Sequence, residues 1–412
     1  MNSKRLNICL LFSVPYEPNM PVRPAVMEIY GKCLPGLGHK VTWIMPAKEG
    51  VNTVQNKGLE VSIYVIPRYT GSSLIVKIFA RLLFLWREKR LVSKLMRRQK
   101  FDIIQARNNI FEGVLAIYLK RRYKIPFVFQ YTVLKEIYRE YKTNKQLFYF
   151  GKFANYVIRY ILRKADLVFP ISKWMEKELI KEGIPESKMM PVPMGANPEL
   201  FSRNKDGTEI REKYDLNSAE VILYIGIMDK LRQLDILIHA FSKVREKKDN
   251  VKLLMVGEGD DRTNLEELTS TLGIQEDVVF TGQVSYFDVP YFIAAADVCV
   301  SLVPPLSTYK VSSPTKIFEY MVMGKPVVAN EEIPEQKEVI EESSGGILVK
   351  FDDESLANGI IELLDDPDRS KEMGRKGHEW VVKNRSYENM AWQVEKKYYE
   401  LLESYKNQKK KD

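Results

Sequence analysis

The segment SSPTKIFEYMVMGKPVVAN, residues 312–330, contains residues that suit the binding of an anion. It also contains one carboxylate, Glu319. Pro314 suits the first position of a helix, and Ser312 or Ser313 suits its N-cap. A helix start offers unpaired N–H groups and a partial positive charge, and Lys316 adds a cation that the helix dipole alone would disfavour. This combination predicts a bound anion such as a phosphate.

Glu319 lies one turn further along the same predicted helix. It could accept hydrogen bonds from the two hydroxyls of a ribose, as acidic residues do in dinucleotide sites. Phosphate at the helix start and ribose one turn on would make a site for a nucleotide diphosphate. The alternative interpretation is an amphipathic helix on which Lys316 and Glu319 form a solvated i,i+3 pair.

Short apolar segments rich in β-branched and aromatic residues recur along the chain and predict buried parallel strands. They are residues 6–12, 40–45, 59–66, 101–106, 127–131 and 166–172, then 221–226, 251–257, 278–282, 297–302, 326–330 and 345–349. Helix-like segments separate them, which is the βαβ pattern of doubly wound sheets. The stretch 191–209, rich in Pro, Gly and Asn, is expected to link two domains, and 386–402 to form one amphipathic helix. Because open α/β sheets bind ligands at the carboxyl ends of their strands, a cleft between the domains is the expected site.

The 412 residues are enough for two or three domains. Cys9, Cys33 and Cys299 are far apart and form no CxxC pair, which argues against a disulfide framework or a zinc site and fits a reducing compartment. The apolar run after Lys4-Arg5 is short, so a first β-strand is expected rather than a leader peptide. No run reaches the roughly 18–20 apolar residues of a membrane span.

Charge is distributed unevenly along the chain. Residues 1–200 carry 34 Lys and Arg against 15 Asp and Glu, whereas residues 201–412 carry 29 against 39. Residues 74–164 alone hold 22 basic and 5 acidic side chains. A basic half of this kind attracts anionic surfaces or polymers.

Two basic segments, 74–100 and 135–164, are predicted to be helices in which cations alternate with aromatic and aliphatic side chains. This pattern is typical of helices that lie at an anionic membrane surface. It would also suit nucleic acid, whose bases stack on aromatic rings. A third interpretation is that both helices pack on the first sheet and leave their basic faces solvated. The membrane interpretation is favoured, and nucleic acid is not expected as a partner.

Several segments, in order, resemble the GT4 family of retaining glycosyltransferases, which have the GT-B fold. They are residues 166–201 (domain junction), 224–241 (phosphate loop and helix), 256–268, 278–304, 312–330 (donor motif) and 363–381. The resemblance is clear over about residues 160–395 and looser before them. It implies an α/β protein with two Rossmann-like doubly wound parallel-sheet domains facing across a cleft.

The resemblance also implies roles for individual residues. Glu319 matches the second Glu of the family's E-x7-E motif and would bind the ribose, while Lys316 and Arg232 would stabilise the leaving diphosphate. The residues implied in donor binding are Gly226, Lys230, Gly257, Glu258, Ser313, Pro314, Thr315 and Glu319. Gly226 would let the backbone approach the diphosphate, and Gly257 and Glu258 would lie beside the base.

The sequence departs from the family pattern at several positions. Val311 replaces the first Glu of E-x7-E, and Ile227 replaces an Arg after Gly226. The positive charge would then come from Arg232, Lys230 or Lys316. The Gly-Gly loop after the first strand is replaced by VPYEPNMPVRP. These departures leave the donor sugar open more than the reaction class.

Only three histidines occur, His39, His239 and His378, and none is expected at the site. The resemblance implies that the leaving diphosphate oxygen itself takes the acceptor proton. The candidates on the acceptor side are Arg107, Asn108, Glu112 and Gln130, each of which could instead be a solvated residue at a strand end. No DxD cluster lies near the proposed site, so neither a metal nor another cofactor is expected.

These observations lead to a hypothesis with three segments. Residues 1–195 would be a membrane-facing acceptor domain, 200–385 a nucleotide-sugar domain, and 386–405 a helix returning to the first domain. The protein would move a sugar from a nucleotide-sugar donor to a lipid-linked or polysaccharide acceptor, as a peripheral protein on the inner face of the cytoplasmic membrane. The alternatives are a nucleotide-sugar 2-epimerase of GT-B fold and a catalytically degenerate nucleotide-sugar-binding scaffold.

Overall fold

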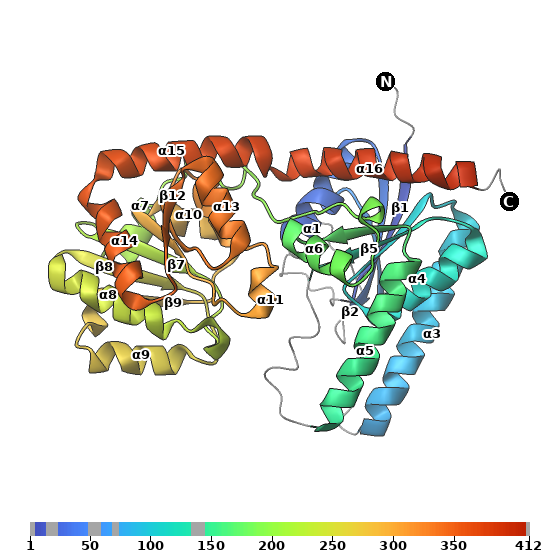
Figure 1. The fold of residues 1–412 in the computed structure, drawn as a ribbon, viewed down its shortest axis with the longest axis horizontal. Coiled ribbons are helices and arrows are strands. Elements are labelled where there is room, and N and C mark those ends of the chain that lie inside the picture. The colour runs from blue at the N-terminus through green and yellow to red at the C-terminus, as the bar shows by residue number, and fades with distance from the viewer. Residues whose placement is uncertain (1–4, 14–23, 48–58, 68–73, 133–144, 409–412) are drawn as a thin grey trace. The chain divides into compact units, whose positions relative to one another are not determined.

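The computed structural model describes residues 5–13, 24–47, 59–67, 74–132 and 145–408. The chain forms two compact units (Figure 1). The first comprises Met1–Pro193 together with Tyr387–Asp412, and the second comprises Met194–Ser386.

The first unit is built on a six-stranded parallel sheet with the order β3-β2-β1-β4-β5-β6. The strands are β1 (Asn7–Leu11), β2 (Lys40–Ala47), β3 (Ser62–Pro67), β4 (Ile103–Arg107), β5 (Phe127–Tyr131) and β6 (Leu167–Pro170). Every residue of β4, β5 and β6 is buried. Burial on both faces explains why these strands read as continuous apolar runs in the sequence.

Helices flank this sheet. They are α1 (Pro24–Val26), the π-helix η1 (Met27–Cys33), α2 (Leu34–Gly36), α3 (Leu74–Arg98), α4 (Ile110–Tyr123), α5 (Lys145–Lys164), α6 (Lys173–Lys181), η3 (Glu186–Lys188) and α16 (Tyr387–Gln408). Asn109 caps α4 and Ser172 caps α6 through side-chain oxygens. The predicted basic helix 135–164 begins at Lys145, and residues 133–144 lie outside the described part.

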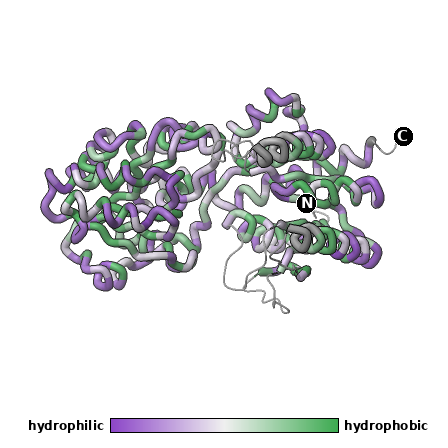
Figure 2. Tube along the Cα trace, turned by 90° about the horizontal axis from the view of Figure 1, so that it is seen from below, coloured by the Kyte–Doolittle hydropathy of each residue, from purple (hydrophilic) through white to green (hydrophobic). Residues whose placement is uncertain are grey.

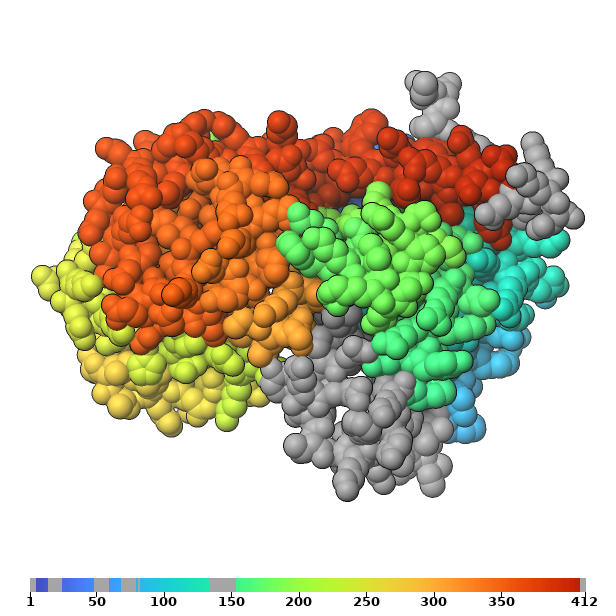
Figure 3. All heavy atoms as spheres, in the orientation of Figure 1, coloured from blue at the N-terminus to red at the C-terminus, as the bar shows by residue number. Residues whose placement is uncertain are grey.

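The C-terminal helix α16 lies on the surface of the first unit (Figure 3) and packs against η1. His39, buried at the start of β2, joins the helix to the sheet. Its Nδ1 accepts a hydrogen bond from the Leu6 amide at 3.1 Å, and its Nε2 lies 2.9 Å from Glu395 Oε1. Both ring nitrogens of His39 are thus engaged within the protein, which gives this histidine a structural role.

The second unit contains another six-stranded parallel sheet, with the order β12-β11-β10-β7-β8-β9. Its strands are β7 (Glu220–Ile225), β8 (Val251–Val256), β9 (Val278–Gly282), β10 (Val298–Ser301), β11 (Val327–Asn330) and β12 (Gly346–Val349). Its helices are α7 (Thr208–Lys213), η4 (Lys230–Arg232), α8 (Asp235–Lys247), α9 (Arg262–Thr271), η5 (Gln275–Asp277), α10 (Val289–Ala294), α11 (Ser307–Lys310), α12 (Thr315–Val322), α13 (Pro334–Ser343), α14 (Asp353–Asp365) and α15 (Pro367–Asn384).

Each unit has an apolar interior and a polar exterior. Figure 2 shows hydrophobic segments inside both units and hydrophilic segments along their outer turns. In the second unit α8 and α14 enclose a core with β7 and β8, in which Tyr224, Phe241 and Met255 are fully buried. The two doubly wound parallel sheets confirm the predicted fold class.

Among the residues that the structure describes, no helix has the length and apolar character needed to cross a bilayer.

Candidate functional site

Two strand-end loops meet at the carboxyl edge of the second unit's sheet. Gly226 follows β7 and Gly257 follows β8, and the Gly226 amide donates to the Val256 carbonyl at 2.9 Å. A Cβ on Gly257, whose φ is +143°, would lie 1.9 Å from the Gly226 carbonyl oxygen. A Cβ on Gly226 would lie 3.0 Å from the Tyr224 hydroxyl and 3.2 Å from Lys316 Nζ. Gly257 is therefore required sterically, and Gly226 leaves a space beside a basic side chain.

Helix α12 begins next to these loops at Thr315, one residue later than the sequence predicted. Pro314 occupies the N-cap position and makes no side-chain cap, so the first amides of the helix have no partner within it. The predicted cap by Ser312 or Ser313 is wrong because both hydroxyls bond elsewhere, that of Ser312 to the Tyr309 carbonyl at 2.7 Å. The Ser313 hydroxyl accepts from the Met194 amide at 2.9 Å and donates to Glu335 Oε1 at 2.8 Å.

Glu319 lies one turn into α12 and is only 7% exposed. Its Oε1 is buried and has no hydrogen-bond partner among the described residues. Burial raises the pKa of Glu319 to about 7, although Tyr286 and the charge of Lys316 offset part of the increase. A buried carboxylate oxygen without a partner is a ready acceptor for a ligand hydroxyl. The predicted solvated Lys316–Glu319 pair is wrong, since Glu319 is not solvated.

Lys316 interacts electrostatically with both Glu319 and Arg232, and each of the two basic side chains is held over an aromatic ring. Lys316 Nζ lies 3.7 Å from the centre of the Tyr224 ring, and the Arg232 guanidinium carbon lies 4.8 Å from that of Tyr309. Burial, reinforced by the charge of Arg232, holds the pKa of Lys316 well below that of an ordinary lysine, while Glu319 acts in the opposite direction. The site thus carries two mutually repelling cations beside an uncapped helix start, which is an arrangement that attracts an anion.

The other predicted donor residues differ in position. Lys230 is exposed at the start of η4. Glu258 follows Gly257, accepts from Arg262 at 2.8 Å and from the Gly259 amide at 3.2 Å, and these bonds lower the pKa of its carboxyl. Its carboxylate is therefore already engaged by protein donors.

The two departures from the family pattern have different structural meanings. Val311 is 6% exposed and belongs to the core, so the first Glu of the E-x7-E motif is replaced by a packing residue. Ile227 is 56% exposed directly after Gly226. The missing arginine therefore leaves an accessible apolar side chain at the site.

The four acceptor-side candidates lie together in the first unit, where β4 and β5 end. Arg107 pairs in register with Gln130, and Glu112 occupies the first turn of α4. Arg107, Glu112 and Gln130 are 8%, 0% and 3% exposed, so the alternative of solvated strand-end residues is wrong for these three. The Asn108 side chain bonds to Thr132 through both its amide atoms, which gives it a local structural role.

The sequence interpretation missed three tyrosines at the donor-side site, Tyr224, Tyr286 and Tyr309. Tyr224 reads as an ordinary core residue of an apolar strand, and it is fully buried. No spacing rule links it to Lys316, because their contact depends on the tertiary fold. Tyr286 and Tyr309 follow β9 and β10, and their positions after strand ends were the only available signal.

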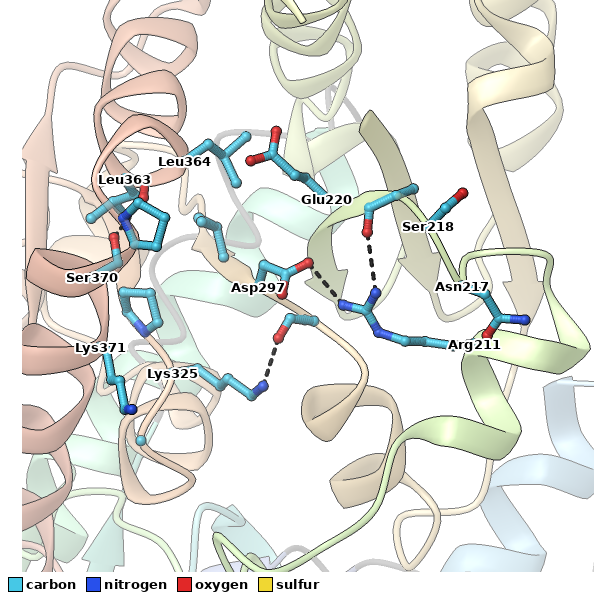
Figure 4. Close-up of a pocket in the computed structure, with 16 residues that line it drawn as sticks. Arg211, Asn217, Ser218, Glu220, Asp297, Lys325, Leu363, Leu364, Ser370 and Lys371 are labelled. Carbon is cyan, nitrogen blue, oxygen red and sulfur yellow. Dashed lines mark hydrogen bonds and ion pairs between the residues drawn. The ribbon is translucent and has the colours of Figure 1, made fainter. Parts of the chain in front are cut away.

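A cavity of about 530 Å³ lies at the opposite, amino edge of the same sheet (Figure 4). The Arg211 guanidinium bonds to Asp297 at 2.8 Å, and Lys325 Nζ donates to the carbonyls of Ala294 and Ala296 at 2.9 and 2.6 Å. These three charged side chains are thus already engaged by groups of the protein. We assign no ligand to this cavity.

Within the described ranges, no group of three or more His, Cys, Asp or Glu side chains is arranged to hold a metal ion.

Comparison with known proteins identifies the family. The chain matches the profiles Glycosyl transferases group 1, over residues 206–380, and Glycosyltransferase Family 4, over residues 26–200. It is 26% identical over 237 residues to the GDP-mannose-dependent alpha-(1-6)-phosphatidylinositol monomannoside mannosyltransferase of Mycolicibacterium smegmatis, covering 56% of this chain and 61% of that protein. It is 25% identical over 276 residues to the alpha-monoglucosyldiacylglycerol synthase of Streptococcus pneumoniae, covering 66% and 60%. The match therefore spans about three fifths of the length of these relatives.

Solved structures agree on the fold. The sucrose-phosphate synthase of Thermosynechococcus elongatus aligns with a TM-score of 0.75 at 20% identity, over 97% of this chain and 100% of that one. The chain thus belongs to the GT4 family of retaining glycosyltransferases and has the GT-B fold.

Proposed function

We propose that this glycosyltransferase uses the second-unit site to bind a nucleotide-sugar donor and transfers its sugar to a lipid-linked or polysaccharide acceptor. The observation that carries the proposal is the buried Glu319 carboxylate, whose Oε1 has no hydrogen-bond partner among the described residues, one turn from an uncapped helix start. Glu319 would accept from the ribose hydroxyls. Lys316, Arg232 and the first amides of α12 would bind the diphosphate.

The same residues would serve the reaction as well as binding. Cleavage of the sugar–phosphate bond leaves negative charge on the diphosphate, and fixed donors around it stabilise that charge in the transition state. The leaving oxygen would take the acceptor's proton while the protein holds both substrates in place.

Transfer from labelled nucleotide sugars tests this proposal. Glu319→Gln keeps the side-chain size but removes the charged acceptor, and we expect it to abolish transfer while the protein stays folded. Glu341→Gln, an exposed α13 carboxylate outside the site, is the matched control and should retain full activity. Unchanged transfer by Glu319→Gln contradicts the site. Binding without transfer would favour a scaffold, and epimerised donor formed without acceptor would favour an epimerase.

The acceptor class is inferred from three helices of the first unit, α3, α4 and α5. Helix α4 packs against both of the others. Each helix exposes an apolar or aromatic stripe with the spacing i, i+3, i+7. The stripes are Phe79, Leu82 and Trp86 on α3; Phe111, Val114 and Tyr118 on α4; and Phe153, Tyr156 and Tyr160 on α5. Such spacing places the three side chains of each stripe on one face of its helix.

The charge of these helices fits an anionic lipid surface. They contain only two carboxylates, Glu88 and Glu112, which are 1% and 0% exposed. The cations Lys89, Arg90 and Arg121 are exposed, and the first two stack on Tyr118 and Trp86. Aromatic rings beside cations suit the headgroup region of a bilayer. We propose that this surface docks on the inner face of the cytoplasmic membrane.

The names of two relatives support a lipid-linked acceptor. One acts on a phosphatidylinositol monomannoside, and the other is a monoglucosyldiacylglycerol synthase. A third, an N-acetyl-alpha-D-glucosaminyl L-malate synthase, shows that acceptors vary among relatives, so the lipid proposal rests mainly on the three helices.

Sedimentation with vesicles tests the docking surface. We expect binding to vesicles containing phosphatidylglycerol but not to pure phosphatidylcholine. The triple variant Trp86→Ser, Phe153→Ser, Tyr156→Ser should lose most of this binding. Trp392→Ser changes another exposed aromatic, 55% exposed on α16, and should bind normally. If the triple variant bound these vesicles as well as Trp392→Ser does, the proposal would be contradicted.

A further inference from the structure

The two cations of the proposed donor site are oriented by aromatic rings instead of by close carboxylates. No ion pair of Lys316 occurs among the described residues, and the nearest carboxylate oxygen recorded for Arg232 is Asp229 Oδ1 at 3.9 Å. A cation stacked on a ring keeps its outer side open to an anion. We propose that Tyr224 and Tyr309 are positioning residues whose ring faces hold Lys316 and Arg232 ready for the donor's diphosphate. This inference rests on the proposed function.

Tyr224 carries a hydroxyl group that a packing role alone would not require. The side chain is fully buried, yet its hydroxyl has no hydrogen-bond partner in the described part of the chain. The hydroxyl and Lys316 Nζ both border the small space that Gly226 leaves open. Burying an unpaired hydroxyl is unfavourable, so phenylalanine would pack at a lower cost if packing were the only requirement. The hydroxyl and the lysine together would suit the oxygens of a phosphate.

The ring of Tyr309 contacts the Arg232 guanidinium, as the ring of Tyr224 contacts the Lys316 ammonium. Tyr309 lies in the short helix α11, and its ring centre is 4.8 Å from the guanidinium carbon. Arg232 belongs to η4, on a separate loop after β7. The ring of Tyr309 therefore adds a contact from a separate element to the position of the Arg232 side chain.

Binding of an anion at this site should change the protonation of Lys316. Lys316 faces Tyr224 from β7, Arg232 from η4 and Glu319 from its own helix, and burial with the Arg232 charge lowers its pKa. An anion bound between the cations would favour the charged form of Lys316. Binding of a diphosphate should therefore be accompanied by uptake of a proton at alkaline pH.

Titration calorimetry tests the inference with inorganic pyrophosphate, UDP and GDP as probes. Heats measured at pH 8.5 in HEPES and in Tris, which differ in ionisation enthalpy, give the number of protons taken up. We expect more uptake by the wild-type protein than by Lys316→Arg, whose cation does not titrate; any uptake that remains in the variant would come from Glu319. Tyr309→Leu and Tyr224→Leu should bind each recognised probe about tenfold more weakly, the loss of one cation–π contact. Tyr309→Phe keeps the ring and should bind as tightly as the wild type.

The outcomes separate this inference from the proposed function. Tyr309 is only partly buried, so its leucine variant should fold even if Tyr224→Leu does not. Wild-type affinity in Tyr309→Leu would overturn the inference while leaving the proposed function intact. If the wild-type protein bound none of the three probes, the proposed function would fail and this inference with it.

Discussion

Glu319 is a residue whose burial opposes folding at alkaline pH. Its pKa rises from an ordinary 4.5 to about 7 in the folded protein. Between these values the folded protein holds a proton that the unfolded chain releases, so its contribution to stability falls as the pH rises. A residue kept under such a cost, with an oxygen left unsatisfied, is better explained by ligand binding than by packing.

Glu319→Gln should therefore raise stability while removing function. The neutral amide resembles the protonated acid, so the variant should match the wild type near pH 4.5. At pH 8.5 it should be more stable by up to about 3 kcal/mol, from a pKa shift of roughly 2.5. Melting temperatures at both pH values measure this difference. A variant that is less stable than the wild type at pH 8.5 would show that the carboxylate is structural.

Val311→Glu and Ile227→Arg each restore a residue typical of the family, but we expect different effects on stability and on nucleotide binding. Val311→Glu would place a charge at a position that is 6% exposed, which should cost at least about 3 kcal/mol without improving nucleotide binding. Ile227→Arg changes a side chain that is 56% exposed, so stability should hardly change and diphosphate affinity should rise. Thermal unfolding and titration of both variants check this. A stable Val311→Glu protein with tighter binding would mean that residue 311 belongs to the site.

At this scale the sequence predicted neighbours along one helix and missed partners from other elements. Lys316 and Glu319 are three residues apart on α12, so their proximity could be predicted. The serine cap could not be corrected from local sequence, because Ser313 bonds to Met194 and Glu335, which are distant along the chain. The contact between Tyr224 and Lys316 likewise forms only when β7 and α12 come together.

At the scale of elements, the site depends on two loops that touch through backbone atoms. Gly257→Ala would combine an unfavourable φ of +143° with a Cβ only 1.9 Å from the Gly226 oxygen. We expect a loss of at least about 2 kcal/mol and weaker nucleotide binding. Gly36→Ala is the control, since its Cβ would meet nothing within 4 Å. Equal stability of the two variants in urea denaturation would show that the loops separate easily.

Most strands were predictable because they are short apolar runs between turn residues. The run predicted at 59–66 instead forms β3 at Ser62–Pro67, most of whose side chains are exposed or partly exposed. It was harder to predict which helix residues are exposed and which are buried. The stripe Phe111, Val114 and Tyr118 has the spacing of a core-facing helix, yet these residues are 44%, 47% and 40% exposed. Conversely, Glu112 in the same helix is fully buried. Periodicity identifies a face of a helix but does not say whether protein or another surface covers it.

At the scale of the whole molecule, the charge asymmetry predicts membrane binding that depends on salt. The exposed cations Arg90 and Lys94 lie on α3, and each basic residue near an anionic surface contributes about 1 kcal/mol. Replacing both by Ala should weaken binding to phosphatidylglycerol vesicles about 10- to 30-fold at 0.1 M salt and much less at 0.5 M. Replacing Lys396 and Lys406, exposed on α16, is the control and should have little effect. Equal losses in both pairs would indicate attraction by net charge without a defined surface.

We propose that Glu319 and its neighbouring cations bind a nucleotide sugar. The most direct test of this proposal is thermal unfolding of the wild-type protein and Glu319→Gln with UDP-, GDP-, ADP- and dTDP-sugars at millimolar concentration. A ligand present at about 100 times its dissociation constant adds about 2.7 kcal/mol of stability. We expect sugars of one nucleotide to raise the melting temperature of the wild-type protein by several degrees and to leave that of Glu319→Gln unchanged. No shift with any donor, or an equal shift in both proteins, would contradict the proposal.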